Sequence, residues 1–196
     1  MGLLSLAIWT PIFFGVVLLA LGRDEHANAV RWMALVGALV SLAVTVPLYT
    51  GFELGTAAMQ FVEQGVWIER FNVNYHLGVD GISLWLVLLT AFITVVVVIA
   101  SWESITSRVN QYMGAFLILS GLMIGVFSAL DAMLFYVFFE ATLIPMYLII
   151  GIWGGPNKIY AAFKFFLYTL LGSLLMLVAL IYLYTQSGGS FDLATW

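Results

Sequence analysis

The sequence contains no cysteine and very little charge. Only 8% of its 196 residues are charged, whereas soluble domains carry about 25%. Without cysteine, the chain can form no disulfide, thiolate zinc site or iron–sulfur centre. The two histidines, His26 and His76, lie fifty positions apart, so no histidine-rich metal cluster is available. The chain has six Lys and Arg residues, too few to neutralise many phosphates, which argues against nucleic-acid binding.

Hydrophobic residues, by contrast, make up 64% of the chain, against about 45–50% in an ordinary soluble domain. Six Lys and Arg and ten Asp and Glu cannot cover the surface of a soluble protein of this size. Disorder is excluded as well, because it requires low hydrophobicity and high charge. The composition therefore indicates an integral membrane protein.

The spacing of the charges marks where membrane-spanning helices can lie, because each needs about 20 mostly apolar residues. Four charge-free stretches reach this length, and two more are each interrupted by one charged residue, Glu140 or Lys164. Continuous apolar runs cannot be barrel strands, which alternate with period two. We predict an all-α integral membrane fold with six helices, in a single membrane domain over residues 1–196. The expected helices cover approximately residues 3–21, 32–50, 82–101, 112–130, 132–152 and 159–184.

The loop cations predict the orientation, since cytoplasmic loops are enriched in Lys and Arg. The loop after the second helix carries only Arg70, and neither terminus carries a cation. The loops after the first, third and fifth helices together carry Arg23, Arg31, Arg108 and Lys158. This bias predicts that both termini face outward, which is the periplasmic side in a bacterium.

The longest connection, over about residues 51–81, is predicted to lie on the outer side. Residues 71–77 alternate between apolar and polar side chains, which predicts a short strand or hairpin arm over the helices. Asp80 is placed to cap the start of the third helix. Asp131 occupies the very short linker between the fourth and fifth helices, which we therefore expect to be antiparallel neighbours. We expect Asp131 to be a solvated turn residue.

Two ionisable residues, Glu140 and Lys164, lie inside predicted membrane helices. Each costs about 2.5–3.5 kcal/mol on insertion scales, and residues of this kind usually serve proton or ion movement. Glu140 lies about 12 Å along its helix, close to the middle of a bilayer. A structural role stays open as the alternative for each residue. Glu140 could form a hydrogen bond that joins two helices, and Lys164 could extend its amine to the lipid headgroups.

Other polar features surround these two residues in the sequence. Pro145 removes the amide that would bond the carbonyl of Ala141, so we expect a kink and a free carbonyl as an anchor for water. A proline that is merely tolerated is the alternative. One face of the sixth helix carries Tyr160, Lys164, Tyr168 and Gly172. This face is either a polar relay or a packed side of small and aromatic residues. Thr169 and Ser173 lie on other faces of the helix.

Three segments stand out as a set. They are YHLGVDGIS at residues 75–83, FEATLIPMY at residues 139–147 and AAFKFFLY at residues 161–168. Together they resemble the N-terminal part of subunit M of bacterial NADH:quinone oxidoreductase (respiratory complex I), a family of antiporter-like subunits. The resemblance runs over nearly the whole chain, and the last two segments are its most specific part.

The resemblance implies a proton-translocating membrane-arm subunit that couples electron transfer from NADH to quinone to proton movement. It implies that Glu140 is the family's helix-five glutamate and Lys164 a lysine at the matching place in helix six, with Pro145 and Tyr168 in support. NAD, FMN, iron–sulfur clusters and quinone would belong to the parent complex and not to this chain. Expected partners are the other membrane-arm subunits, the lipid bilayer and protons, in the bacterial inner membrane.

Members of this family are much longer than this chain, and they contain inverted repeats and a lysine on a seventh helix that have no counterpart here. We therefore expect a fragment. Two other functions stay open. The chain could be a subunit of a multisubunit cation/proton antiporter or membrane-bound hydrogenase, or a non-conducting scaffold for assembly.

Overall fold

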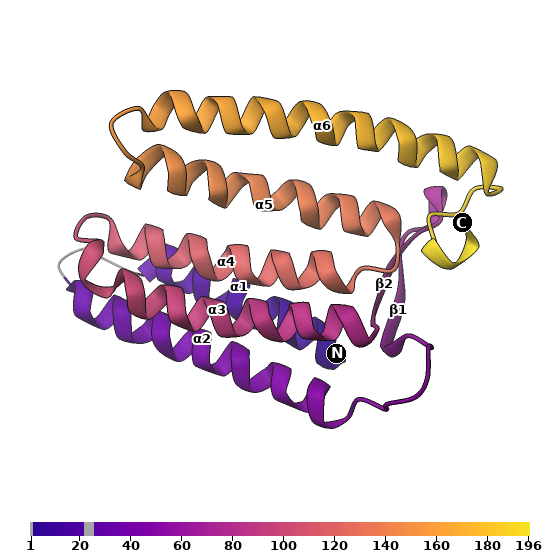
Figure 1. Ribbon diagram of the computed structural model, residues 1–196, viewed down its shortest axis with the longest axis horizontal. Helices are drawn as coiled ribbons and strands as arrows, with labels where there is room; N and C mark the ends of the chain where they lie inside the picture. The colour runs from indigo at the N-terminus through magenta and orange to yellow at the C-terminus, as the bar shows by residue number, and fades with distance from the viewer. Residues whose placement is uncertain (1, 22–25) are drawn as a thin grey trace.

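The computed structural model describes residues 2–21 and 26–196. Six of its helices are long and apolar enough to cross a membrane, and they lie side by side (Figure 1). A two-stranded sheet, β1 (Gln60–Ile68) and β2 (Val73–Val79), covers one end of them. The predicted all-α membrane fold is confirmed. The helices are α1 (Leu3–Leu21), α2 (Ala27–Thr50), α3 (Gly81–Ser104), α4 (Val109–Ser128), α5 (Ala132–Trp153) and α6 (Lys158–Gln186).

Several helix boundaries differ by a few residues from the expected ones, and the contacts of two of them explain the difference. Helix α2 begins at Ala27, so Arg31 lies inside the helix, where its guanidinium donates to the Ile105 carbonyl at 3.0 Å. Helix α4 ends at Ser128 because the next residues join the sheet, and the Leu130 amide donates to the carbonyl of His76 at 2.8 Å. Arg23, the other cation assigned to this first loop, lies outside the described residues.

Helices α1 and α4 pack so closely that their backbones meet. A Cβ atom added at Gly121 would lie 2.5 Å from the carbonyl oxygen of Ile8, and one at Gly15 would lie 2.7 Å from that of Gly114. Between apolar helices in a membrane, close van der Waals packing of this kind replaces the hydrophobic effect as the source of association. The α1–α4 pair is therefore the rigid centre of the bundle.

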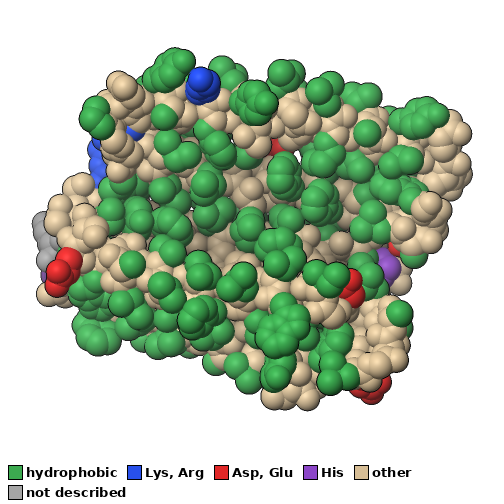
Figure 2. Space-filling view, viewed as in Figure 1, with side chains coloured by type: hydrophobic (Ala, Val, Ile, Leu, Met, Phe, Trp, Pro, Cys, Tyr) green, Lys and Arg blue, Asp and Glu red, His purple; other side chains and the backbone are tan. Residues whose placement is uncertain are grey.

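Helix α6 lies at the edge of the bundle and packs chiefly against α5 (Figure 1). Only 11% of the residues in its most apolar stretch are buried, against 28–50% in the other five candidate spans. Apolar side chains cover the visible face of the molecule, and most charged side chains on it gather near the two ends of the helices (Figure 2). This distribution is the one expected for a protein surrounded by lipid.

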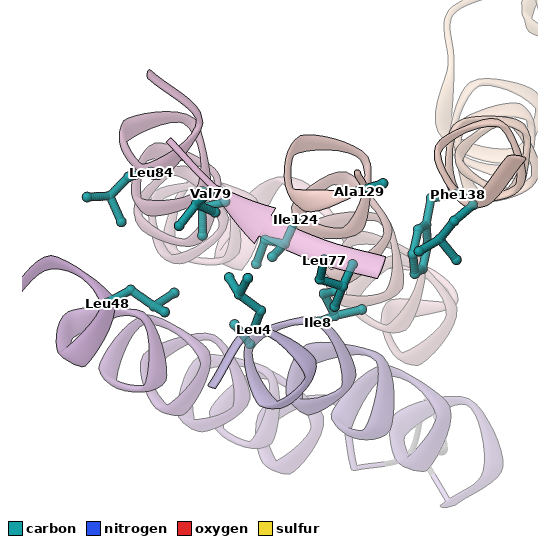
Figure 3. Close-up of a cluster of buried hydrophobic side chains, with 12 residues drawn as sticks. Leu4, Ile8, Leu48, Leu77, Val79, Leu84, Ile124, Ala129 and Phe138 are labelled. Carbon is teal, nitrogen blue, oxygen red and sulfur yellow. The ribbon is translucent and has the colours of Figure 1, made fainter. Parts of the chain in front are cut away.

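The sheet is a β-hairpin that closes one end of the bundle. The predicted strand over residues 71–77 corresponds to β2, although Phe71 belongs to a short turn (Glu69–Phe71) and not to the strand. The sequence pattern missed β1, which pairs antiparallel with β2. Leu77 and Val79 enter a core that includes side chains from α1 to α5 (Figure 3). The helix residues labelled there are Leu4, Ile8, Leu48, Leu84, Ile124 and Phe138.

Asp131 fastens the hairpin to the start of α5. Its carboxylate accepts hydrogen bonds from the amides of Met133 at 2.9 Å and Leu134 at 3.0 Å, and also from the Asn74 amide of β2 at 3.0 Å. The expectation of a solvated residue was wrong, because the side chain is 1% exposed. Its burial follows from serving two elements at once: it caps a helix and completes a strand. The predicted pairing of α4 and α5 as neighbours is confirmed.

Two further carboxylates cap helices at the same end. Asp80 accepts from the Ser83 amide at 2.7 Å and its own amide donates to the Ser83 hydroxyl at 2.9 Å, which confirms the predicted cap of α3. Glu63 of β1 accepts from the amides of Leu4 at 2.8 Å and Ser5 at 3.1 Å at the start of α1. Negative charge is favourable at a helix N-terminus. The hairpin end therefore holds the starts of α1, α3 and α5 through acidic side chains that accept hydrogen bonds from helix amides.

Substitutions of two mid-membrane glycines test the packing. Gly121→Ala should destabilise the protein by about 1–3 kcal/mol, because the new methyl group meets the α1 backbone. Gly172→Ala is the matched control, since a Cβ there meets nothing within 4 Å, and it should be neutral or slightly stabilising. Thermal unfolding in detergent micelles measures both. Equal effects of the two substitutions would contradict the close contact of α1 and α4.

The Asp80 cap predicts a pH dependence at the start of α3. The hydrogen bond from the Ser83 amide is the largest cause that lowers the pKa of Asp80 below its usual 3.8. The ionised cap therefore stabilises the folded state fully above about pH 4, and this contribution is lost as the pH falls through the lowered folded-state pKa. Hydrogen-exchange protection of the Ile82 and Ser83 amides should fall in that acid range. Asp80→Asn should abolish the dependence, and unchanged protection of the native protein down to about pH 2 would refute it.

Candidate functional site

Glu140 lies in the middle of α5, on the side that faces α6. It is the ninth residue of a 22-residue helix, about 12 Å from the hairpin end. The side chain is partly buried, and its Oε2 accepts a hydrogen bond from the hydroxyl of Ser173 on α6. Ser173 is 3% exposed. The hydrogen bond between helices that the sequence left open for Glu140 is therefore present.

A second hydroxyl continues from this bond. The Tyr136 hydroxyl lies 3.4 Å from Ser173 Oγ, and Tyr136 precedes Glu140 by one turn of α5. Three polar side chains from two helices thus form a chain through otherwise apolar surroundings. Neither Tyr136 nor Ser173 was a candidate from the sequence. Tyr136 could have been identified from its position four residues before Glu140, because residues i and i+4 share a helix face.

Lys164 lies far from Glu140. It precedes Ser173 by nine residues, which corresponds to about 14 Å along α6 and about half a turn around it. Since Ser173 faces α5, Lys164 faces away, and its side chain is exposed with the ammonium 5.8 Å from the centre of the Tyr160 ring. Among the described residues, Glu140 and Lys164 form no ion pair.

The stripe of polar and aromatic residues on α6, formed by Tyr160, Lys164, Tyr168 and Gly172, lies on the same outward face as Lys164. Tyr160 is 70% exposed and Tyr168 is 81% exposed, and both line a shallow groove beside Lys164. The stripe is therefore not packed within the described chain, and Tyr168 does not lie beside Glu140. The face that contacts α5 contains Ala162, Ser173 and Leu180, the buried residues of α6.

Pro145 is buried on another side of α5, and the helix continues through it to Trp153. It lines a cavity of about 410 Å³ between α1, α4 and α5, where most of the lining is apolar and Gln111 is a polar exception. Ile144, also in the lining, follows Glu140 by one turn. The proline therefore contributes to a mostly apolar cavity wall that does not include Glu140.

The described chain offers little for a metal. Within residues 2–21 and 26–196, no three His, Asp or Glu side chains come together as potential ligands. His76 lies in β2, with its Nδ1 atom 3.9 Å from a carboxyl oxygen of Asp192. The arrangement at Glu140 suits proton exchange between a carboxyl group and hydroxyls.

Two family profiles together match most of the chain. Residues 29–128 match the profile described as NADH-ubiquinone oxidoreductase chain 4, amino terminus. Residues 129–195 match the one described as NADH:quinone oxidoreductase/Mrp antiporter, TM. Among curated relatives, NADH-quinone oxidoreductase subunit M of Rhodobacter capsulatus is 50% identical over 95% of this chain, and NADH-ubiquinone oxidoreductase chain 4 of Arabidopsis thaliana is 43% identical over 94%.

Solved structures show the same fold. A chain of respiratory complex I from Thermus thermophilus, solved with bound NADH, superposes with a TM-score of 0.83 at 31% identity over 98% of this chain. A chain of the Mrp complex from Dietzia superposes with a TM-score of 0.79 over 95% of this chain, but at 19% identity, which shows the fold alone. This chain spans 36–38% of the length of the R. capsulatus, A. thaliana and T. thermophilus chains.

The rotational setting of α6 can be tested with spin labels. The native chain has no cysteine, so Lys164→Cys and Ser173→Cys each give a single labelling site. A nitroxide at position 164 should be mobile and accessible to oxygen in a lipid bilayer, because this position faces away from α5. One at position 173 should be immobilised against α5. Equal accessibility at both positions would contradict the orientation of α6.

Proposed function

The chain belongs to the family of NADH-quinone oxidoreductase subunit M and NADH-ubiquinone oxidoreductase chain 4, and from this we propose a proton-translocating role in the membrane arm of that complex. It is a multi-pass membrane protein with six candidate spans. In the proposed role, other subunits transfer electrons from NADH to quinone, and this chain moves protons across the membrane. Its partners are the neighbouring membrane-arm subunits, in the inner membrane of a bacterium.

The observation that carries the proposal is a carboxyl group at mid-membrane depth. Glu140 is partly buried, accepts a hydrogen bond from Ser173 and has no ion-pair partner among the described residues. A carboxylate in this position costs free energy that one hydroxyl does not fully offset. Taking up a proton removes the charge and the cost, so Glu140 is suited to alternate between the two forms.

Glu140 is the proton acceptor and donor in this proposal. Lys164 is a second proton-transfer candidate, but it acts from the outward face of α6 and not by pairing directly with Glu140. Tyr168 supports that same face, where a neighbouring subunit would cover both side chains. Pro145 is a supporting residue, because it has no amide hydrogen to donate to the carbonyl of Ala141, the residue next to Glu140. That free carbonyl is an anchor for water beside the acid.

The direction of the protein in the membrane follows from its cations. Among the described residues outside the membrane spans and at their ends, Arg31, Arg108 and Lys158 lie at the end opposite the hairpin, and Arg70 lies at the hairpin end. Lys and Arg favour the cytoplasmic side. We therefore place the hairpin and both described chain ends on the outer side.

Sequence identity separates this proposal from an antiporter role. The chain is 31% identical to a complex I chain but 19% identical to chains of the Mrp complex and of an archaeal sulfane sulfur reductase. The last two likenesses extend to the fold alone. A purely structural role is disfavoured because a neutral side chain could accept the same hydrogen bond from Ser173 without placing an acid at mid-membrane depth.

Glu140→Gln tests the proposal in the assembled, membrane-reconstituted NADH:quinone oxidoreductase. Glutamine keeps the size and still accepts from Ser173, but it cannot take up a proton, so proton pumping by this route should fall by about 100-fold or more. Pumping is followed with a pH-sensitive dye while NADH oxidation is recorded. Glu103→Gln, at the exposed end of α3, is the matched control and should pump normally.

Retained pumping in the Glu140→Gln complex would remove Glu140 from the mechanism. Sodium–proton exchange that depends on Glu140 but not on NADH would replace the proposal by the antiporter role. Assembly without any effect of Glu140→Gln on ion movement would leave the scaffold role.

A further inference from the structure

We propose that Ser173 and Tyr136 are relay residues that carry the proton of Glu140 toward the hairpin end of the membrane. This inference rests on the proposed function and adds a direction and two residues to it. It starts from the chain of three oxygens, in which Ser173 Oγ touches the Glu140 carboxylate and lies 3.4 Å from the Tyr136 hydroxyl.

The chain of hydroxyls points in one direction along the membrane. Tyr136 precedes Glu140 by four residues, which places it about 6 Å nearer to the hairpin end of α5. Ser173 joins the two from the neighbouring helix, so neither acid nor tyrosine has to move to exchange a proton through it. The relay therefore covers about half of the distance along α5 between Glu140 and the hairpin end.

The opposite direction offers no comparable chain among the described side chains. The hydroxyl of Thr142 donates to the Phe139 carbonyl at 2.6 Å, and that of Thr169 donates to the Phe165 carbonyl at 2.8 Å. Both protons are engaged by the backbone of their own helices. The cavity beside Pro145 is mostly apolar and gives no continuous hydrogen-bonded path.

The relay conserves protons at each step. With Glu140 ionised, Tyr136 donates to Ser173 and Ser173 donates to the carboxylate. With Glu140 protonated, the hydroxyls turn, so that the carboxyl group donates to Ser173 and Ser173 donates to Tyr136. When Glu140 releases its proton, Ser173 accepts it and passes its own proton to the Tyr136 oxygen, and Tyr136 passes its proton to a water molecule that enters from the hairpin side.

An apolar layer closes the relay at its hairpin end. The Tyr136 ring packs against a buried cluster that combines β2, the start of α5, the end of α6 and the C-terminal segment. Its buried members are Val73, Ala132, Leu180 and Phe191. Such a layer prevents continuous leakage, because protons do not cross apolar packing without an intervening polar group. The relay therefore passes a proton onward only when water reaches Tyr136 through this layer.

The test uses four variants in the assembled, membrane-reconstituted complex. Ser173→Ala and Tyr136→Phe remove the relay hydroxyls and should lower the protons pumped per NADH oxidised by about 10-fold or more. Ser173→Thr restores a hydroxyl and should pump normally. Thr169→Val is the matched control, since it removes a hydroxyl of the same helix that is bonded to its own backbone.

An infrared measurement reads the hydrogen bond without pumping. The carbonyl band of protonated Glu140, identified by its loss in Glu140→Gln, should shift to higher frequency in Ser173→Ala and return in Ser173→Thr. The band shows whether the bond between Ser173 and Glu140 is made, and lowered pumping in Tyr136→Phe, which keeps that bond, distinguishes a relay from a structural serine. If Ser173→Ala does not assemble, Tyr136→Phe decides, because it keeps the ring packing and removes only the hydroxyl.

The outcomes separate the relay from the proposed function. Normal pumping in Ser173→Ala and Tyr136→Phe, with Glu140→Gln inactive, overturns the relay and leaves the proton-translocating role intact. Equal loss in Ser173→Ala and Ser173→Thr also overturns it, because the hydroxyl would then be irrelevant. Normal pumping in Glu140→Gln overturns both.

Discussion

Hydrocarbon offers no partner to a polar group, so each one inside the bundle must find a partner within the protein. The described helices meet this constraint mainly with their own backbones: the hydroxyls of Thr90 and Ser128, for example, each donate at 2.7 Å to a carbonyl one turn earlier. Glu140 cannot do the same, because a carboxylate only accepts hydrogen bonds. Its bond to Ser173 joins two helices, and it has no cationic partner among the described residues, which is the physical basis of its proposed role.

Hydrogen bonds at the hairpin end fix the position of α5, the helix that carries Glu140. Asp131 caps α5 and bonds to β2, so the first turn of α5 is fixed relative to the sheet. Glu140 follows nine residues later on the same rigid helix, and its position relative to α6 is therefore fixed from that end. Helix α6 contacts chiefly α5, and the Glu140–Ser173 bond lies within this contact.

Structural features that depend on residues close together in the chain could be predicted from the sequence. The six spans follow from the spacing of charges, and the cap at Asp80 follows from its position directly before an apolar run. Contacts between distant residues could not be predicted in this way. The burial of Asp131 depends on Asn74, 57 positions away, and the partner of Glu140 is 33 positions away. The rotation of α6 was equally hidden, because a helix that faces lipid is apolar on both its packed and its exposed sides.

Proton exchange by the Glu140 carboxyl group from inside the membrane can be measured directly. Solid-state NMR of this chain in lipid bilayers is suited to this, with the side-chain carboxyl carbon of glutamate labelled and the Glu140 signal identified by its absence in Glu140→Gln. We expect this signal to move between its protonated and ionised positions as the bulk pH is changed, despite its depth. A signal that keeps one position at every pH at which the protein stays folded would show that Glu140 does not exchange protons.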